Sequence, residues 1–248
     1  MKFKTKMAVV MLSMASVSAQ ADTIFSQAWD GTGYSTLSEQ DLSSPNSPNG
    51  TFGDFSKNWD NFSFNPATTS SAAITGVSWY GSYDAGIAAQ NPTFLVQIWA
   101  DNGAGIVNTT APLFSESFAS ANETFVDSTA AKFASAAAEN YQYSVNLASA
   151  FDATAGVTYW LSIQAGIYMG GASGSDFTPL WYWNTAYGSG GDGKSYYDYA
   201  NTIYAPTTPR DFAYSLTGTL QAVPVPSAIW LFGSALAGLG LLRKKAIA

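Results

Sequence analysis

The chain has 248 residues, contains no cysteine and no histidine, and is 47% hydrophobic and 15% aromatic. This composition excludes disulfides, thiolate nucleophiles, imidazole bases and zinc sites built on Cys or His. The apolar content is ample for a folded core. All 17 acidic residues lie between Asp22 and Asp211, a stretch with only four basic residues, so nucleic acid is not an expected partner.

The N-terminus has the pattern of an export signal. Lysines at positions 2, 4 and 6 precede the apolar residues 7–17, and Ala19 and Ala21 are small residues at the two positions that a signal peptidase reads. The pattern predicts a signal peptide over residues 1–21 and a mature chain that starts near Asp22. A buried first helix is the alternative, but the apolar run is short and flanked by charge.

The C-terminus has three parts, which together form a separate unit over residues 223–248. Prolines interrupt the chain in the motif 223–227, residues 228–242 are apolar or glycine, and a basic tail occupies residues 243–248. A helix over 228–242 would be roughly 22 Å long, shorter than the ~30 Å hydrocarbon core of a bilayer. We therefore expect this segment to be only a marginal membrane anchor. Basic residues at both ends of the chain place the domain between them, residues 22–222, outside the cell.

The C-terminal unit resembles the PEP-CTERM sorting signal, in the variant with an apolar residue between two prolines and a Trp-Leu-Phe-Gly-Ser helix start. This resemblance implies recognition by an exosortase-type membrane protease, transient membrane insertion, removal of the helix, and delivery to the surface or matrix of a biofilm-forming Gram-negative cell. Val225 stands where the commoner form has glutamate. An ordinary membrane anchor is the alternative. The residues that carry the resemblance are Val223, Pro224, Val225, Pro226, Ser227, Trp230, Arg243, Lys244 and Lys245.

The central region alternates apolar and polar residues with a period of two, which predicts half-buried β-strands. Phe94, Val96 and Ile98 would face inward in one strand, and residues 141–147, 157–165 and 212–220 follow the same pattern. Glycine and asparagine turns separate the segments. We therefore expect an all-β domain with a single antiparallel β-sandwich of jelly-roll-like type. Further strands are predicted at 24–29, 60–64, 73–80, 113–118, 180–187 and 195–199, and either a helix or a loop at 126–139.

Several segments of the domain also resemble the ectodomain that often precedes this sorting signal. They are residues 59–62, 74–81, 98–103, 158–163 and 211–214. The resemblance implies a sandwich fold and brings no catalytic residues with it.

Tryptophans are the first candidate ligand contacts. Trp99 and Trp160 fall on the polar face of their strands, where an exposed indole could stack on a sugar of an extracellular polysaccharide. Trp181 and Trp183 share one face of another strand. The alternative is that these rings are buried by the second sheet or by a loop.

Acidic loop residues suggest a calcium site. Asp101, Asn102 and Asp192 lie in glycine-bearing loops and offer the oxygen ligands that calcium prefers. No EF-hand spacing is present, and the alternative is that these side chains hold their own turns. No other cofactor is expected.

The sequence leaves three functions open. The first is an exported, non-catalytic protein that binds exopolysaccharide, and the second is a structural matrix protein without a ligand. The third is a secreted carbohydrate-active enzyme, which without histidine would need a pair of carboxylates that the sequence does not single out.

Overall fold

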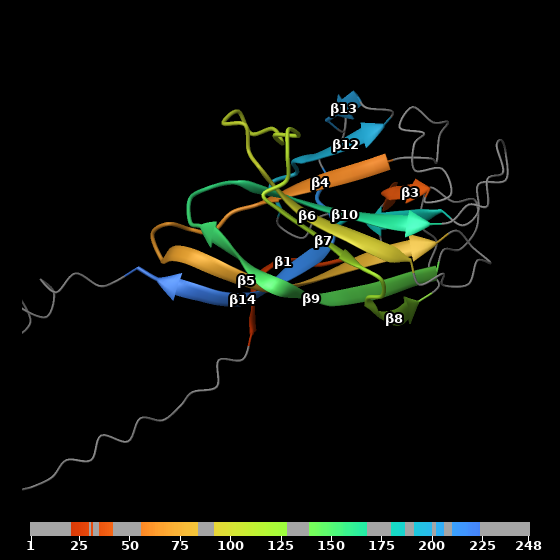
Figure 1. Ribbon diagram of the computed structural model, residues 1–248, viewed down its shortest axis with the longest axis horizontal. Coiled ribbons are helices and arrows are strands. Elements are labelled where there is room, and N and C mark those ends of the chain that lie inside the picture. The colour runs from red at the N-terminus through yellow and green to blue at the C-terminus, as the bar shows by residue number, and fades with distance from the viewer. Residues whose placement is uncertain are drawn as a thin grey trace, which may run out of the picture.

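The computed structural model describes residues 21–29, 31, 35–41, 56–83, 92–127, 139–167, 180–186, 191–199, 202–205 and 210–223. Every regular element in these ranges is a β-strand, and the strands form two sheets of seven strands each (Figure 1). Within the same ranges there is no helix of the length and apolarity that a membrane crossing requires.

The first sheet is organised around the long strand β5 (Thr69–Tyr83), which pairs with strands on both sides. On one side lie β9 (Glu139–Thr154) and then β8 (Asn122–Asp127). On the other side, β5 pairs with β14 and with β11, which lead to the outer strands β1 and β2. These four strands are β1 (Asp22–Gln27), β2 (Ser35–Leu37), β11 (Trp181–Asn184) and β14 (Tyr214–Ala222), and all pairs are antiparallel.

The second sheet has β10 (Tyr159–Ile167) at its centre, between β4 (Ser56–Phe62) and β6 (Thr93–Ala100). The strand β7 (Phe114–Phe118) lies beyond β6, while β12 (Ser195–Tyr199) and β13 (Thr202–Tyr204) lie beyond β4. The short strand β3 (Glu39–Asp41) pairs with β10 in parallel, in contrast to the antiparallel pairs of the rest of this sheet.

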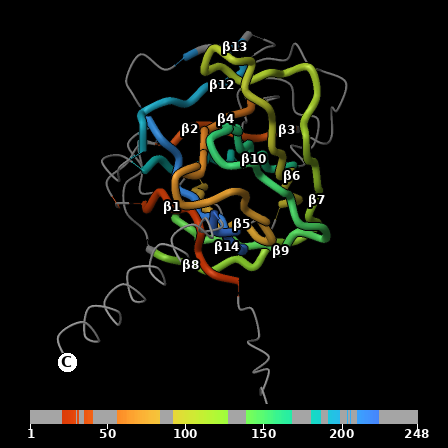
Figure 2. The backbone as a smooth tube through the Cα atoms, turned by 90° about the vertical axis from the view of Figure 1, so that its left-hand side faces the viewer, coloured from red at the N-terminus to blue at the C-terminus, as the bar shows by residue number. Residues whose placement is uncertain are grey.

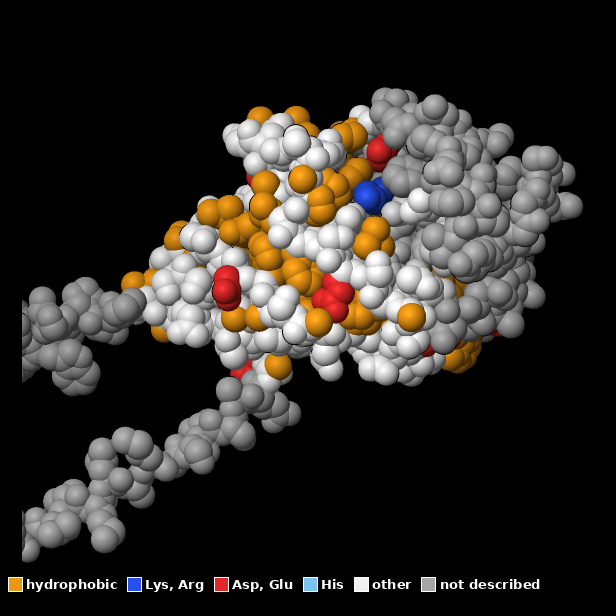
Figure 3. Space-filling view, viewed as in Figure 1, with side chains coloured by type: hydrophobic (Ala, Val, Ile, Leu, Met, Phe, Trp, Pro, Cys, Tyr) orange, Lys and Arg blue, Asp and Glu red, His pale blue; other side chains and the backbone are white. Residues whose placement is uncertain are grey.

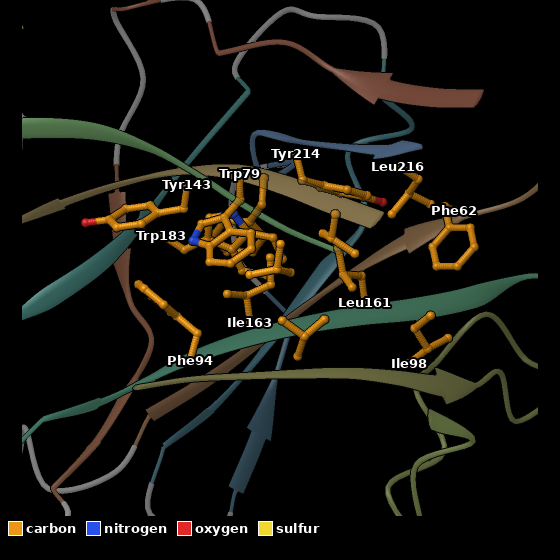
Figure 4. Packing of buried hydrophobic residues seen from close by; sticks show 14 of the residues in the cluster. Phe62, Trp79, Phe94, Ile98, Tyr143, Leu161, Ile163, Trp183, Tyr214 and Leu216 are labelled. Atoms are coloured by element: carbon orange, nitrogen blue, oxygen red, sulfur yellow. The ribbon is translucent and has the colours of Figure 1, made fainter. Parts of the chain in front are cut away.

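The two sheets enclose one large hydrophobic core, which we call the inter-sheet core. In Figure 2 the strands β4, β10 and β6 lie above β5, β14 and β9. Trp79 of the first sheet meets Phe94 of the second with their ring centroids 4.9 Å apart, and both side chains are fully buried. Figure 4 shows the side chains of the two sheets pointing toward one another. Packing of this kind contributes most of the stability of a domain without disulfides.

The structure confirms the prediction of an all-β fold with antiparallel sheets. The inward positions Phe94, Val96 and Ile98 are all fully buried. Val157, which alternation also placed inward, lies exposed in the turn before β10. For 126–139 we expected either a helix or a loop, and both expectations are wrong at the two ends of this stretch. Residues 126–127 belong to β8 and residue 139 begins β9, where pairing with a neighbouring strand prevails. Residues 128–138 lie outside the described ranges.

Candidate functional site

The outer face of the second sheet carries a small aromatic cluster that includes Trp99 and Trp160. These residues are direct register partners on β6 and β10, and both point away from the inter-sheet core, as alternation predicted. Trp59 on β4 joins them, with its ring centroid 6.2 Å from that of Trp99 in an edge-to-face arrangement. We call the set Trp59, Trp99, Val107, Trp160 and Tyr196 the outer tryptophan cluster.

The loop 101–107 covers this cluster. Asp101 Oδ1 accepts hydrogen bonds from the backbone N–H groups of Gly103 and Gly105 at 2.7 and 3.2 Å, and its Oδ2 accepts one from Trp160 Nε1 at 3.0 Å. The backbone conformation of both glycines has a positive φ, which lets the loop fold back. Val107 then packs on the rings.

The expectation that Trp99 and Trp160 are exposed is therefore wrong. Trp160 is fully buried and Trp99 is 7% exposed, because the loop 101–107 lies over their side of the sheet. The sequence predicted the outward direction of the two side chains correctly, but it did not predict that a loop covers them. Neither ring offers a free face for stacking on a sugar.

Trp181 and Trp183 share one strand face, as predicted, and that face points into the inter-sheet core. Both are fully buried. Trp183 stacks on Phe212 with a centroid distance of 4.5 Å, and Trp181 meets Phe94 edge to face at 5.3 Å. These two tryptophans support the packing of the domain rather than a ligand surface.

The acidic residues proposed for calcium hold their own loops. Asn102 Oδ1 accepts a hydrogen bond from Ala104 N at 2.8 Å, in the same loop that Asp101 closes. Asp192 accepts from Lys194 N at 3.0 Å and from Asn61 Nδ2 at 2.9 Å. Across the ranges that the structure describes, no group of three acidic side chains is placed to hold a metal ion.

A buried carboxylate that the sequence reading did not single out connects the two sheets. Asp60 of β4 is fully buried and accepts a hydrogen bond from the backbone N–H of Phe212. The amide of Gln27 on β1 is satisfied when its Nε2 faces Asp60 Oδ2 and the carbonyl of Phe212, each at 2.8 Å. The remaining oxygen of Asp60, Oδ1, is buried without a hydrogen-bond partner. Its inward place beside Phe62 in β4 is the one sequence signal that could have identified it.

Burial raises the pKa of Asp60 well above its ordinary value, and the nearby charges of Asp211 and Asp192 add to the effect. Asp211 also has a raised pKa, because burial outweighs the hydrogen bond that its carboxylate accepts from Gly193 N. Glu39 of β3 has a comparable architectural role, since its Oε2 accepts from Trp181 N at 2.6 Å. Asp60 and Glu39 thus each connect the second sheet to the first.

A cleft of about 180 Å³ opens beside Asp60, between β1, β4 and the segment at 191–192. Its lining includes Phe25 and several polar residues, among them Gln27, Asn61 and Asp192. Gln27 lines the cleft and also contacts Asp60, so the buried carboxylate lies directly behind one wall. Amide and carboxylate groups beside an aromatic ring are suited to hydrogen-bond a small hydroxylated ligand.

A model of one protein family matches residues 67–217, which is more than half of the chain, and its description is "Domain of unknown function (DUF7901)". The chain belongs to this DUF7901 family. No curated protein matches the sequence. The DUF7901 region begins just before β5 and ends within β14, so it contains Trp99, Trp160 and the loop that covers them. Asp60 and the cleft residues of β1 and β4 precede the DUF7901 region.

Two of the predicted processing residues lie at the two ends of the two-sheet domain and are described by the structure. Ala21 is exposed just before β1, and Val223 is 41% exposed just after β14. The other residues proposed for signal cleavage and sorting lie outside the described ranges; they are Ala19, Pro224, Val225, Pro226, Ser227, Trp230, Arg243, Lys244 and Lys245.

Proposed function

We propose that this chain is an exported, non-catalytic protein of the cell surface or extracellular matrix. In this proposal a signal peptidase removes residues 1–21, the apolar residues 228–242 tether the precursor to the membrane, and an exosortase-type protease processes it. The observation that carries the proposal is the position of the sorting-like motif. The last strand within the described ranges, β14, ends at Ala222, directly before the motif begins. A cut within 223–227 would leave both sheets and the inter-sheet core intact.

The fold that we propose for the domain is a single sandwich with jelly-roll-like winding. Two features support it. The sheets share one hydrophobic core, and the chain passes from one sheet to the other at most connections, including β4 to β5, β5 to β6, β9 to β10 and β11 to β12. Such winding places neighbouring segments of sequence in opposite layers.

The structural role without a dedicated ligand is the version that the buried tryptophans favour. All four tryptophans that sequence analysis offered for ligand stacking are buried. The buried carboxylates of Asp60 and Glu39 accept backbone hydrogen bonds that connect the sheets, which supports an architectural rather than a catalytic use of these two residues. The acidic surface expected from the composition would keep the released domain soluble.

The test of processing is the intact mass of the protein recovered from cell-surface and medium fractions. We expect a species that starts near Asp22 and ends within or directly after the motif 223–227. A chain in which Pro224 and Pro226 are both replaced by alanine should remain unprocessed and membrane-bound. Recovery of the native chain only from membranes, with residues 228–248 still attached, would show that the C-terminus is a permanent anchor.

The cleft beside Asp60 supports a second candidate function, the binding of an exopolysaccharide. Phe25 could contact the apolar face of a sugar, and Asn61 and Asp192 could bind its hydroxyl groups. We expect Asp192→Asn to weaken retention of the protein on the host's own polysaccharide severalfold. The matched control is Asp152→Asn, which removes the same charge from an exposed position on β9. Equal retention of both variants and the native protein would rule out this cleft as the binding place.

A further inference from the structure

One end of the domain, which we call the tip, is built from three chain segments. They are the turn before β5, the turn between β9 and β10, and the end of β14, at residues 65–72, 153–158 and 217–223. Backbone hydrogen bonds hold them together. Val223 N donates to Thr68 O at 3.4 Å, and Ala155 N donates to Ser70 O at 3.2 Å. The tip is therefore a structured surface formed by parts of the chain that are far apart in sequence.

The surface of the tip combines uncharged segments with exposed aliphatic side chains. Its three segments contain no charged residue, although the chain has 27 of them, 10 basic and 17 acidic. Three aliphatic side chains are exposed there, since Val157, Leu220 and Val223 have 42%, 46% and 41% of their surfaces accessible. In Figure 3 hydrophobic side chains are visible at the left-hand end of the domain, where β14 ends in Figure 1. An uncharged surface with exposed aliphatic groups is suited to the interface of a lipid bilayer.

The length of chain that follows the tip limits its distance from the apolar C-terminal residues. Only four residues separate Val223 from Ala228, where the apolar run begins. A fully extended chain spans at most about 3.6 Å per residue, so the tip cannot be farther than about 18 Å from the start of that run. When residues 228–242 are in a membrane, the tip is close to its surface.

The N-terminal side of the domain leads to the same end. β1 is antiparallel to β14, and its first residue, Asp22, pairs with Gly218 of the tip. The signal-like apolar residues 7–17 and the C-terminal apolar residues 228–242 therefore join the folded domain on one side. Once residues 1–21 are removed, the C-terminal apolar residues alone keep the tip near the bilayer.

We propose that the tip rests on the outer surface of the lipid bilayer while the precursor is tethered, with the opposite end of the domain directed outward. This inference rests on the membrane-tethered precursor of the proposed function. Val157 and Leu220 contact the interfacial region of the lipid, and the three segments of the tip carry no charge that would have to be desolvated there. The exposed Asp22, which pairs with Gly218, is the charged neighbour of this contact. The motif 223–227 is thereby held at the membrane surface, where a membrane protease acts.

The absence of cysteine makes a direct test practical, because one introduced thiol is the only one in the chain. The full-length Val157→Cys variant is labelled with an environment-sensitive fluorophore and reconstituted into phosphatidylcholine vesicles. Ile203→Cys is the matched control, since Ile203 is also aliphatic, is 38% exposed and lies on β13 at an edge of the other sheet. We expect nitroxide-labelled lipid to quench the probe at position 157 severalfold more strongly than the probe at position 203.

Flotation of the vesicles at high salt separates failure of the tip from failure of the tether. If the chain floats with the vesicles but both probes are quenched equally weakly, the tether holds and the resting tip is wrong. If the probe at position 157 is shielded from aqueous iodide but not quenched by nitroxide lipid, a protein covers the tip and the lipid assignment is overturned. If the chain does not float, the tethered precursor fails and the inference fails with it.

Discussion

The inter-sheet core and the outer tryptophan cluster bury the same kind of side chain in different ways. Trp181 lies between two sheets, enclosed by rings such as Phe94 and Tyr143. Trp160 lies on an outer face and is covered by one short loop, to which it is joined by a hydrogen bond with Asp101. Both residues are fully buried. An outward direction in a strand therefore does not establish exposure, because a local loop can bury a side chain as completely as a second sheet does elsewhere.

The largest difference should appear when each tryptophan is truncated. Trp181→Ala removes a ring that packs so closely on Gly81 that a Cβ atom would not fit there. The change should cost about 3–5 kcal/mol of the free energy of unfolding. Trp160→Ala should cost less, about 2–3 kcal/mol, because the loop can collapse onto the smaller side chain. Urea unfolding measures both values. Equal losses would mean that the loop is as rigid a cover as the opposite sheet.

Removal of the carboxylate that closes the loop should expose the outer tryptophan cluster and leave the inter-sheet core unchanged. Asp101→Ala removes the hydrogen-bond acceptor of Gly103 N, Gly105 N and Trp160 Nε1. Because the two backbone N–H groups can bind water instead, we expect the free energy of unfolding to fall by about 1–2 kcal/mol. The fraction of tryptophan fluorescence quenched by acrylamide should rise. The control Asp152→Asn should leave quenching unchanged. Unchanged quenching in Asp101→Ala as well would mean that Val107 alone keeps the loop closed.

The outer face of β4 also holds a half-buried amine, that of Lys57. Its Nζ donates to Gln97 Oε1 at 2.9 Å and lies 5.3 Å from the ring centroid of Trp99. Burial lowers the pKa of Lys57 from 10.5 to about 8, although the charge of Asp198 opposes this effect. The neutral amine therefore favours the fold, and its contribution is complete above pH 10.5 and is lost as the pH falls to about 8.

We expect Lys57→Met to remove this pH dependence. The stability of the variant relative to the native protein should rise by about 1–2 kcal/mol as the pH is lowered from 10.5 to 8, and then stay constant. Melting temperatures of both proteins across that range provide the measurement. A constant difference would show that the amine is hydrated in the folded protein.

The inner face of the same strand should respond to pH in the opposite sense. The pKa of Asp60 is raised above 3.8 by burial, so the protonated carboxyl favours the fold. This contribution is complete below pH 3.8 and is lost as the pH rises toward the raised pKa.

In Asp60→Asn the melting temperature should decline less between about pH 4 and 7 than in the native protein. The two proteins should differ least at the acidic end, because the amide keeps an acceptor for Phe212 N. Asp211, whose pKa is also raised, contributes a decline of the same sign in both proteins. Identical pH profiles would show that Asp60 is ionised in the folded state.

Local patterns predicted the strands because alternation depends on neighbouring residues. Phe94, Val96 and Ile98 carry their direction in their own sequence, and the structure places them in the core. The cover over Trp99 was not predictable in this way. Turn chemistry indicated a loop at 101–103, but nothing local shows that the loop folds back over β10.

Contacts between distant segments explain what the sequence did not show about the candidate site. Asp60 and its partner Phe212 are 152 positions apart, so their hydrogen bond depends on the assembly of both sheets. The cleft likewise combines β1 and β4 with the segment at 191–192. Composition indicated how few charges the chain contains, but only the fold shows that the tip has none and that both apolar ends lead to it.

The antiparallel pair of β1 and β14 has a mechanical consequence. Asp22 begins β1 beside Gly218, near the end of β14, so a force applied between the two ends of the domain pulls on the same side of this pair. Its backbone hydrogen bonds would then break one after another, as in the opening of a zipper, rather than all at once as in sliding. A domain held by both ends in a matrix would thus yield at low force, starting with β1, whereas a domain held by its C-terminus alone would bear no load across the sheet.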